Sequence, residues 1–328
     1  MKISKYKNLV LSSIVLLLMM LFIINPKPNL EACLNGLIVW STAIAPALFP
    51  FLIFTKLLSE LNFIENVSIY LSPLTKKLFR TPGVSAYIYT ISILSGYPVG
   101  AKLTADFYEK GILTKDQACR IVTFTSTSGP LFIIGTVGIG MFDNKAIGIT
   151  ILISHFIGAI LNGLLYRNYM YNNVNIAEDI NFSKINNKNL LEDIMLNSIK
   201  SILIIGGYVA IFFVIITMLN NANLLLPINN MLSYIFNSIG LPTSISSPIV
   251  NGLVEVTKGC LDLSQVNNIS STLKCAIATF LISFGGLSIH MQSLTFIKRF
   301  DIKLSFYFLQ KATHAIISTI VAILLCLI

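Results

Sequence analysis

Residues 93–102 read ILSGYPVGAK and interrupt an apolar run that extends from Val84 to Ala105. An apolar run of about 20 residues can cross the ~30 Å hydrocarbon core of a bilayer as one helix. A cluster of Gly, Pro and Ser cannot continue a regular helix, so this run predicts a helix that is broken inside the membrane. Similar interruptions occur further along the chain, at Ser128-Gly129-Pro130, around Asn251-Gly252 and Glu255, and at Gly285-Gly286.

The composition indicates a membrane protein. Of the 328 residues, 55% are hydrophobic and 11% are charged, and the mean hydropathy is +0.78. A soluble domain carries about 25% charged residues, so a cytosolic enzyme is excluded. The five cysteines are dispersed and lack the spacing of a disulfide framework or a metal site, so we expect no metal and no cofactor. The net charge of +9 comes from scattered basic residues rather than a patch, which argues against a nucleic-acid partner.

The apolar runs predict an all-α, polytopic helical bundle with about seven full spans and two re-entrant hairpins. The predicted spans are 9–24, 34–58, 118–142, 145–166, 201–219, 273–296 and 304–328, and the predicted hairpins are 84–105 and 244–263. Residues 223–243 are mildly amphipathic and are expected to lie at the membrane interface. Pro46 and Pro50 predict a kink in the second span. The first span resembles a secretory signal without a cleavage site, so we expect it to stay as an anchor.

Lys and Arg residues in short loops set the predicted orientation. Most of the positive charge is cytoplasmic when the cytoplasmic segments are the N-terminus, 59–82, 167–200 and 298–311. The first hairpin then enters from the cytoplasmic side and the second hairpin from the opposite side. We expect four parts: an anchor span at 1–33, a first half at 34–166, a cytoplasmic polar loop at 167–198 and a second half at 199–328.

An internal repeat relates the two halves. At an offset of 156 residues, 11 of the 41 positions from 93 to 133 are identical to their partners, where about three or four identities are expected by chance. The matched positions include Gly96 with Gly252, Lys102 with Lys258, Asp106 with Asp262, and Gly129 with Gly285. Inverted repeats with broken helices are typical of secondary transporters, which bind substrate near the midplane between the halves. Two unrelated glycine-containing helices in a tightly packed bundle are the alternative.

The breaks would supply free backbone groups and polar side chains to a ligand. A helix that stops inside the bilayer leaves up to four N–H or C=O groups unpaired, and a helix N-terminus favours an anion. Residues 126–128, Ser-Thr-Ser, precede Pro130, which predicts cap residues followed by a proline just inside a helix start. Ser288 and Gln292 are four residues apart and share one helix face. Hydrogen bonds from these hydroxyls back to their own helix are the alternative.

Four ionisable residues fall at membrane depth: Lys102, Glu255, Lys258 and His290. Such groups are expensive in a bilayer and indicate function by default. The two lysines could instead snorkel to the interface or pair with the aspartate one helical turn further on. Glu255 could accept a hydrogen bond from substrate, bind a coupling cation or carry a proton. His290 could titrate near neutral pH or make a single structural hydrogen bond.

Four segments of the chain carry a family resemblance. They read SGYPVGAK at 95–102, STSGPL at 126–131, GLVEVTKG at 252–259 and SFGGLSIHMQ at 283–292. In this order they are similar to the sporulation integral membrane protein YlbJ family, which has a nucleoside-recognition Gate domain similar to the core of concentrative nucleoside transporters. The resemblance covers nearly the whole chain and implies two inverted Gate-type repeats.

The resemblance also implies a location, a substrate and a site. It implies an integral protein of the outer forespore membrane in an endospore-forming bacterium, which moves dipicolinic acid out of the mother cell. In the related nucleoside transporters, substrate lies between two opposed hairpins and two broken helices. This implies a substrate-binding set of Gly96, Tyr97, Pro98, Gly100, Lys102, Ser126, Thr127, Ser128, Gly129, Asn251, Gly252, Glu255, Thr257, Lys258, Ser283, Gly285, Gly286, Ser288, His290 and Gln292. Dipicolinate is a flat ring with two carboxylates, so we expect Lys102 and Lys258 to contact its two ends.

Other roles stay open at this point. They are a nucleoside or other small-anion carrier, a structural or signalling protein of the forespore envelope, and, with least support, an intramembrane enzyme. The sequence has no nucleophile beside a base, no metal cluster and no phosphate loop, so we expect no enzymatic activity. A homo-oligomeric state and the identity of the coupling ion are also left open.

Overall fold

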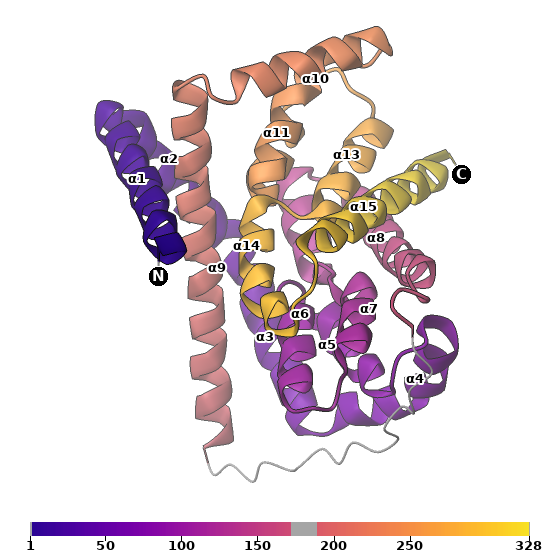
Figure 1. Cartoon of the computed structure of the whole chain (residues 1–328). Coiled ribbons are helices and arrows are strands. Elements are labelled where there is room, and N and C mark those ends of the chain that lie inside the picture. The colour runs from indigo at the N-terminus through magenta and orange to yellow at the C-terminus, as the bar shows by residue number, and fades with distance from the viewer. Residues whose placement is uncertain (1, 172–188, 328) are drawn as a thin grey trace.

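The structure is a computed structural model that describes residues 2–171 and 189–327, and within these ranges the chain forms helices and no strand. In chain order the elements are α1 (Lys2–Ile24), α2 (Pro26–Val39), η1 (Trp40–Ile44), α3 (Ala45–Glu60), α4 (Phe63–Phe79), α5 (Val84–Ser95), α6 (Val99–Glu109), α7 (Lys115–Thr125), η2 (Phe132–Met141), α8 (Lys145–Leu165), α9 (Leu190–Asn221), α10 (Leu226–Ser238), η3 (Thr243–Ile245), α11 (Ser246–Val254), α12 (Val256–Ser264), α13 (Ser271–Phe284), α14 (Leu287–Ile297), η4 (Lys298–Phe300) and α15 (Leu304–Leu327). Figure 1 shows their arrangement. The predicted all-α class is confirmed.

Five helical segments are long and apolar enough to cross a membrane by length and composition, so the chain is a polytopic membrane protein. They are Pro26–Glu60, Lys145–Leu165, Leu190–Asn221, Ser271–Phe300 and Leu304–Leu327. Two of the predicted spans fall short of this length. The apolar part of α1 is only Leu9–Ile24, and the predicted span 118–142 is divided into α7 and η2.

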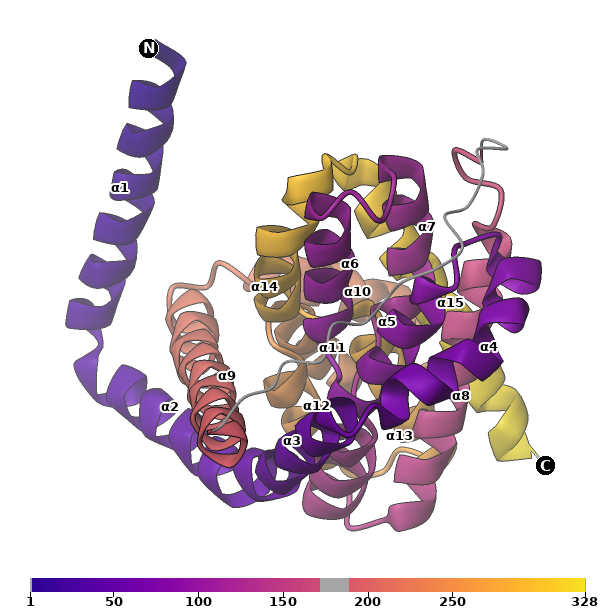
Figure 2. The same ribbon diagram turned by 90° about the horizontal axis from the view of Figure 1, so that it is seen from below.

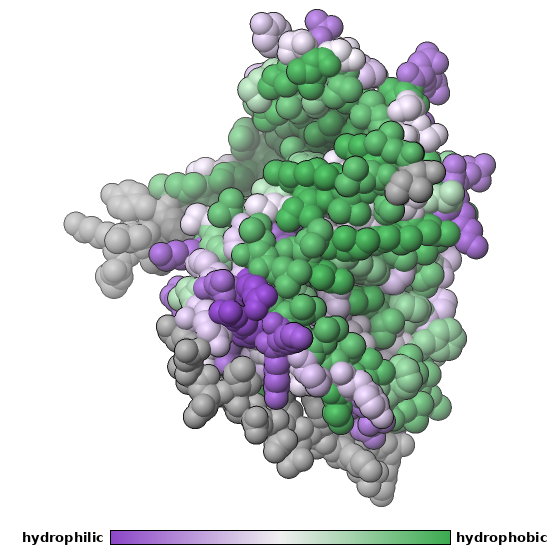
Figure 3. Space-filling view, turned by 90° about the vertical axis from the view of Figure 1, so that its right-hand side faces the viewer, coloured by the Kyte–Doolittle hydropathy of each residue, from purple (hydrophilic) through white to green (hydrophobic). Residues whose placement is uncertain are grey.

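Apolar side chains cover most of the molecular face that carries the C-terminal helix (Figure 3). Leu161 of α8 and Ile316 and Ile320 of α15 are among the exposed large hydrophobic residues. Such a surface is stable against lipid tails but not against water. In contrast, α10 contains no buried residue and lies across one end of the bundle in Figure 1, as an interfacial helix would.

The N-terminal arm differs from the predicted division at residue 33. Asn25 is the one residue between α1 and α2, and Pro26 occupies the first turn of α2, where a missing N–H is tolerated. The predicted boundary between 1–33 and 34–166 therefore falls inside a helix. The predicted kink is present as the π-helical turn η1, directly before Pro46 near the start of α3. In Figure 2, α1 extends away from the bundle, whereas α2 and α3 pass along α9.

The stretch 167–198, predicted as a polar loop, ends in helical residues. Residues 190–198 form the first turns of α9, where Glu192 and Asp193 favour a helix N-terminus by opposing its dipole. Residues 172–188 of that loop lie outside the described part of the chain. Similarly, the stretch predicted as polar at 59–82 contains the amphipathic helix α4.

All four predicted helix breaks are present. The α5–α6 pair is interrupted at Gly96-Tyr97-Pro98, and the α11–α12 pair at Glu255. Residues 126–129 separate α7 from the helical turns that lead into η2, and Gly285-Gly286 separates α13 from α14. The re-entrant path of the two hairpins and the inverted arrangement of the halves stay predictions.

Candidate functional site

The four breaks meet at one small cavity of about 90 Å³. Each break contributes to its wall, and α9 closes one side with Tyr208. The lining residues from the breaks are Ser95, Gly96, Tyr97, Ser128, Gly129, Glu255, Val256, Thr257, Ser288 and Gln292. The structure therefore brings together segments that are up to about 200 residues apart in sequence, as expected for a site between two halves.

Two glycines allow the breaks to approach this closely. Gly96 has a φ of 73°, and a Cβ atom there would lie 2.6 Å from the backbone nitrogen of Gly129. A Cβ atom on Gly286 would lie 2.9 Å from the carbonyl oxygen of Val254. In each half, therefore, a hairpin tip packs backbone to backbone against a neighbouring broken helix, which only a residue without a side chain permits.

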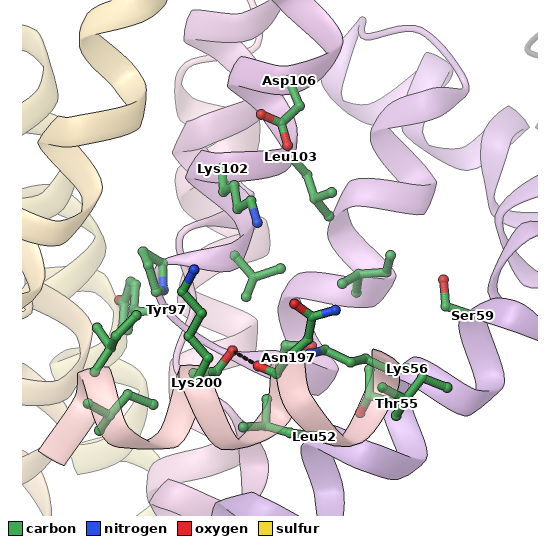
Figure 4. A pocket seen from close by; sticks show the side chains of 18 of the residues that line it. Leu52, Thr55, Lys56, Ser59, Tyr97, Lys102, Leu103, Asp106, Asn197 and Lys200 are labelled. Atoms are coloured by element: carbon green, nitrogen blue, oxygen red, sulfur yellow. Dashed lines mark hydrogen bonds between the residues drawn. The ribbon is translucent and has the colours of Figure 1, made fainter. Parts of the chain in front are cut away.

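A larger cavity of about 810 Å³ adjoins the small one (Figure 4). The two cavities share Ser95, Tyr97, Tyr208 and Gln292 in their walls. A volume of this order is within the range of sites that bind small organic ligands, about 300–1,000 Å³. We call it the outer cavity, and the smaller one the inner cavity.

Three lysines from three different helices line the outer cavity: Lys56 of α3, Lys102 of α6 and Lys200 of α9. Figure 4 shows the ammonium groups of Lys102 and Lys200 pointing into the same space. None of the three makes an ion pair with a carboxylate in the described ranges. Lys56 and Lys102 also repel each other electrostatically, so an anion between them would be attracted by both.

The carboxylates of the outer cavity are Glu60, Asp106 and Asp193. Asp106 accepts a hydrogen bond from Arg299 at 3.3 Å, and Arg299 also contacts Glu109 at 3.2 Å. Arg299 therefore forms the ion pair with Asp106, the aspartate that lies one helical turn from Lys102. The predicted alternative, that Lys102 pairs with Asp106, is not found.

Lys258 behaves differently from its repeat partner Lys102. Its ammonium group forms an ion pair with Asp262 one turn further along α12, and Asp262 also accepts a 2.8 Å hydrogen bond from Asn251. Lys258 lines neither cavity. The structure therefore does not bring Lys102 and Lys258 to one cavity, and α12 supplies Lys258 with its own counter-charge at Asp262.

Glu255 borders the inner cavity and is only 4% exposed. As the N-cap of α12, its carboxylate accepts hydrogen bonds from the backbone N–H of Lys258 at 2.7 Å and from the hydroxyl of Thr257 at 3.2 Å. The first N–H groups of α12 have no acceptor within that helix, and the Glu255 carboxylate provides an acceptor for one of them. The carboxylate thus stabilises the hairpin tip from within its own helix.

Half of the predicted site residues line a cavity: Gly96, Tyr97, Pro98, Lys102, Ser128, Gly129, Glu255, Thr257, Ser288 and Gln292. The other half line neither of these two cavities: Gly100, Ser126, Thr127, Asn251, Gly252, Lys258, Ser283, Gly285, Gly286 and His290. Ser288 and Gln292 do share a face, and the Gln292 amide donates to the Ser288 carbonyl at 3.2 Å.

The hydroxyl caps predicted at 126–128 do not form. Among the residues that the structure describes, the buried hydroxyls of Ser126 and Thr127 have no hydrogen-bond partner, and no side chain caps η2. Instead, the backbone N–H of Ser128 donates to Nε2 of His155 at 2.9 Å. His290 is turned away from the cavities, and its Nδ1 lies 3.1 Å from the Tyr307 hydroxyl.

Sequence reasoning missed several polar residues near the breaks. Lys56, Lys200 and Tyr208 line the outer cavity, and Lys311, His155 and His314 are buried next to the breaks. The pair Gln310-Lys311 inside the apolar run 304–328 was an available signal, since an uncompensated lysine in a membrane span indicates function. In the described ranges, no group of three His, Cys, Asp or Glu side chains is arranged to hold a metal ion.

The fold is similar to that of the solved membrane protein CNTnw. A solved structure of CNTnw in an outward-facing state superposes with a TM-score of 0.55, and covers 96% of this chain and 87% of that chain at 13% sequence identity. No family model matches the chain. The sequence is 28% identical to the sporulation integral membrane protein YlbJ of Bacillus subtilis (strain 168) over 349 aligned residues, which cover 99% of this chain and 84% of that protein. The resemblance to YlbJ expected from four short segments is confirmed along nearly the whole chain.

Proposed function

We propose that this protein is a sporulation transporter that moves dipicolinic acid from the mother cell across the outer forespore membrane. The similarity to YlbJ supports a role in sporulation, and the likeness of fold supports a carrier. One observation carries the proposal: four broken helices meet at an inner cavity, and this cavity adjoins an outer cavity whose three lysines make no ion pair with a carboxylate of the described residues.

The outer cavity suits a flat aromatic dianion. Lys56, Lys102 and Lys200 offer three ammonium groups from separate helices, so two carboxylates on one ring can each find a cation. Tyr97 and Tyr208 stand in the walls of both cavities and can pack against an aromatic ring. Lys56 and Lys200, rather than Lys258, are therefore the lysines that we expect to contact the second carboxylate of the substrate.

We propose that these residues bind and transport the substrate and do not catalyse a reaction. The tips of α5–α6 and α11–α12 are short helical segments that can move as units around the substrate, while backbone contacts at Gly96 and Gly286 guide the motion. Alternating exposure of the inner cavity to the two sides would then carry the dianion across. The lysines attract the dianion. Because they belong to three different helices, α3, α6 and α9, the affinity for the dianion would fall when these helices move apart.

Purified protein in liposomes that contain Tb³⁺ would test the substrate directly. Dipicolinate chelates Tb³⁺ and makes it luminescent, so entry is read as rising emission inside the vesicles. We expect emission to rise faster than in protein-free vesicles and to saturate with substrate concentration. Equal rates with and without protein would refute the proposal.

A nucleoside carrier is the second candidate, since the fold is shared with a nucleoside transporter. Competition separates the two. Isophthalate carries the same two carboxylates on a flat ring, so it should slow dipicolinate entry, whereas uridine should not. Inhibition by uridine alone would favour the nucleoside carrier. A structural role would be indicated if Lys102→Met and Gln292→Leu left the dipicolinate content of spores unchanged.

A further inference from the structure

Lys311 of α15 is fully buried, with 0% of its surface exposed. A lysine is rarely buried to this extent without a partner, since moving an ammonium group out of water is strongly unfavourable. No Asp or Glu carboxylate lies within ion-pairing distance of it in residues 2–171 and 189–327. Lys311 also lines neither cavity, so the proposed substrate does not neutralise it.

The contacts of Lys311 are oxygen atoms at two helix breaks. Its Nζ donates to the Tyr97 hydroxyl at 2.6 Å and to the backbone carbonyl of Ser126 at 3.3 Å. Tyr97 lies in the break between α5 and α6, and Ser126 is the residue at which α7 ends. The ammonium group also lies 4.6 Å from the centre of the Tyr97 ring, which adds a cation–π contact.

Two helix C-termini point toward this group. The Ser126 carbonyl belongs to the end of α7, and the Tyr97 hydroxyl in turn lies 3.4 Å from the carbonyl of Ile282 in the last turn of α13. Ser126 and Ile282 are partners at the offset of 156 residues. Each helix C-terminus carries about half a negative charge, so together they offset one positive charge without a carboxylate.

The other titratable groups around Lys311 are histidines and a tyrosine. His155 of α8, His290 of α14, and His314 and Tyr307 of α15 are all buried there. Nε2 of His155 accepts from Ser128, so Nδ1 carries the proton that bonds Ser283 at 2.8 Å, and the ring is neutral. The described surroundings of Lys311 thus contain helix dipoles and the neutral His155 ring, but no carboxylate within ion-pairing distance.

Transporters with broken helices bind their coupling cation with unwound carbonyls and helix C-terminal ends. Here an ammonium group fixed to the chain occupies such a position. We infer that Lys311 is a built-in monovalent cation, which fills the cation site between the breaks at 96–98 and 126–129 and makes free sodium unnecessary. The claim that transport needs no free sodium rests on the proposed carrier function. The claim that Lys311 fills a cation site can be tested without transport.

The first test is thermal unfolding of the purified protein in detergent. Lys311→Ala should empty the site and lower the unfolding midpoint by about 5 °C or more, because buried carbonyls lose their donor. Ethylammonium chloride should restore at least half of this loss, whereas choline chloride at the same ionic strength should not, since choline is too large. Lys110→Ala removes an exposed lysine and is the control that should show neither effect.

A second measurement covers the case in which Lys311→Ala does not fold. The wild-type midpoint should be the same in sodium chloride and choline chloride, because the site is already occupied. A midpoint that rises with sodium in the wild type would overturn the inference. So would an unchanged midpoint in Lys311→Ala, or a folded Lys311→Ala that ethylammonium does not stabilise.

Liposome uptake separates this inference from the proposed function. Wild-type dipicolinate entry should be equal with sodium or choline outside the vesicles, and Lys311→Met should lose most of it. Entry that depends on sodium would contradict the built-in cation but leave the substrate assignment in place. Absence of dipicolinate entry in every condition would refute the substrate assignment, and the unfolding experiments would still decide the nature of the site.

Discussion

Lys258 and Asp262 form an ion pair one helical turn apart, whereas the equivalent Lys102 in the first half makes no ion pair with any carboxylate of the described residues. The difference arises because Arg299 approaches Asp106 from η4. Two lysines that match in the repeat thus have different surroundings. One is neutralised within its own helix, and the other lines a cavity with its charge available to a ligand.

The three cavity lysines should contribute to substrate affinity. Replacing Lys56, Lys102 or Lys200 by Met removes one charge-assisted contact and should raise the KM for dipicolinate by about three- to tenfold, with a smaller effect on the maximal rate. Raising the ionic strength should weaken wild-type affinity more than that of the variants. Initial rates of Tb³⁺ luminescence at increasing dipicolinate would measure this.

Lys258→Met and Lys110→Met are the matched controls for these variants. The first lies outside both cavities and the second is exposed, so neither should change KM by more than about twofold. If Lys258→Met raised KM as much as Lys102→Met, the proposal that the lysines of the outer cavity bind the substrate would be incorrect.

The contact between Gly96 and Gly129 should be intolerant of any side chain. Gly96→Ala places a Cβ atom 2.6 Å from the Gly129 nitrogen at a φ of 73°, and should destabilise the fold by about 2–4 kcal/mol. Gly111 has nearly the same φ of 72° but no atom within 4 Å of its Cβ position, so Gly111→Ala should cost about 1 kcal/mol. The difference in unfolding midpoint between the two variants reports the close approach alone, and equal midpoints would show that the breaks can separate freely.

Glu255 should matter to stability as an N-cap. Glu255→Ala leaves the Lys258 N–H and the Thr257 hydroxyl without their acceptor and should lower the free energy of unfolding by about 1–3 kcal/mol. Glu255→Gln keeps one acceptor oxygen and should lose less. Unfolding curves of the two variants would show this order, and a reversed order would rule out the capping role.

The ion pair between Lys115 and Asp301 should make a small, pH-dependent contribution outside the spans. A 2.7 Å hydrogen bond from Lys115 lowers the pKa of Asp301 below its ordinary value of 3.8. A carboxyl group whose pKa is depressed by folding stabilises the fold above that ordinary value, and this stabilisation is lost as the pH falls through the depressed pKa. Asp301→Asn should therefore unfold slightly earlier than wild type at pH 7 and pH 5, and the difference should shrink as the pH falls below 3.8. A difference that grows in acid would contradict this assignment.

The helix breaks were predictable because their cause is local. Gly96 with Pro98, Ser128 with Pro130, and Gly285 with Gly286 disrupt a helix wherever they occur, so a linear pattern suffices. The helix starts at Pro26 and Leu190 were less clear. In both cases a short polar or proline-containing stretch also fits a loop, and helix propensity is overridden by packing along the span.

The cavity lysines could not be predicted, because their position depends on packing between distant helices. Lys56 and Lys200 line the same cavity but belong to α3 and α9. Lys258 and Lys102 match in the repeat, yet Asp262 pairs with Lys258, whereas Asp106 pairs with Arg299, far along the chain. Such differences follow from three-dimensional contacts that an internal repeat does not encode.

The bond between Lys311 and Tyr97 makes the two hairpins mechanically unequal. Tyr97 ties the α5–α6 tip to α15 through a charge-assisted bond of 2.6 Å, whereas the Glu255 carboxylate at the α11–α12 tip is held from within α12. We therefore expect the α5–α6 pair to have a higher barrier to displacement, and the α11–α12 pair to be the more mobile of the two. Amide hydrogen exchange should accordingly be faster at residues 254–258 than at 96–100, and the rate of the transport cycle should follow the second hairpin.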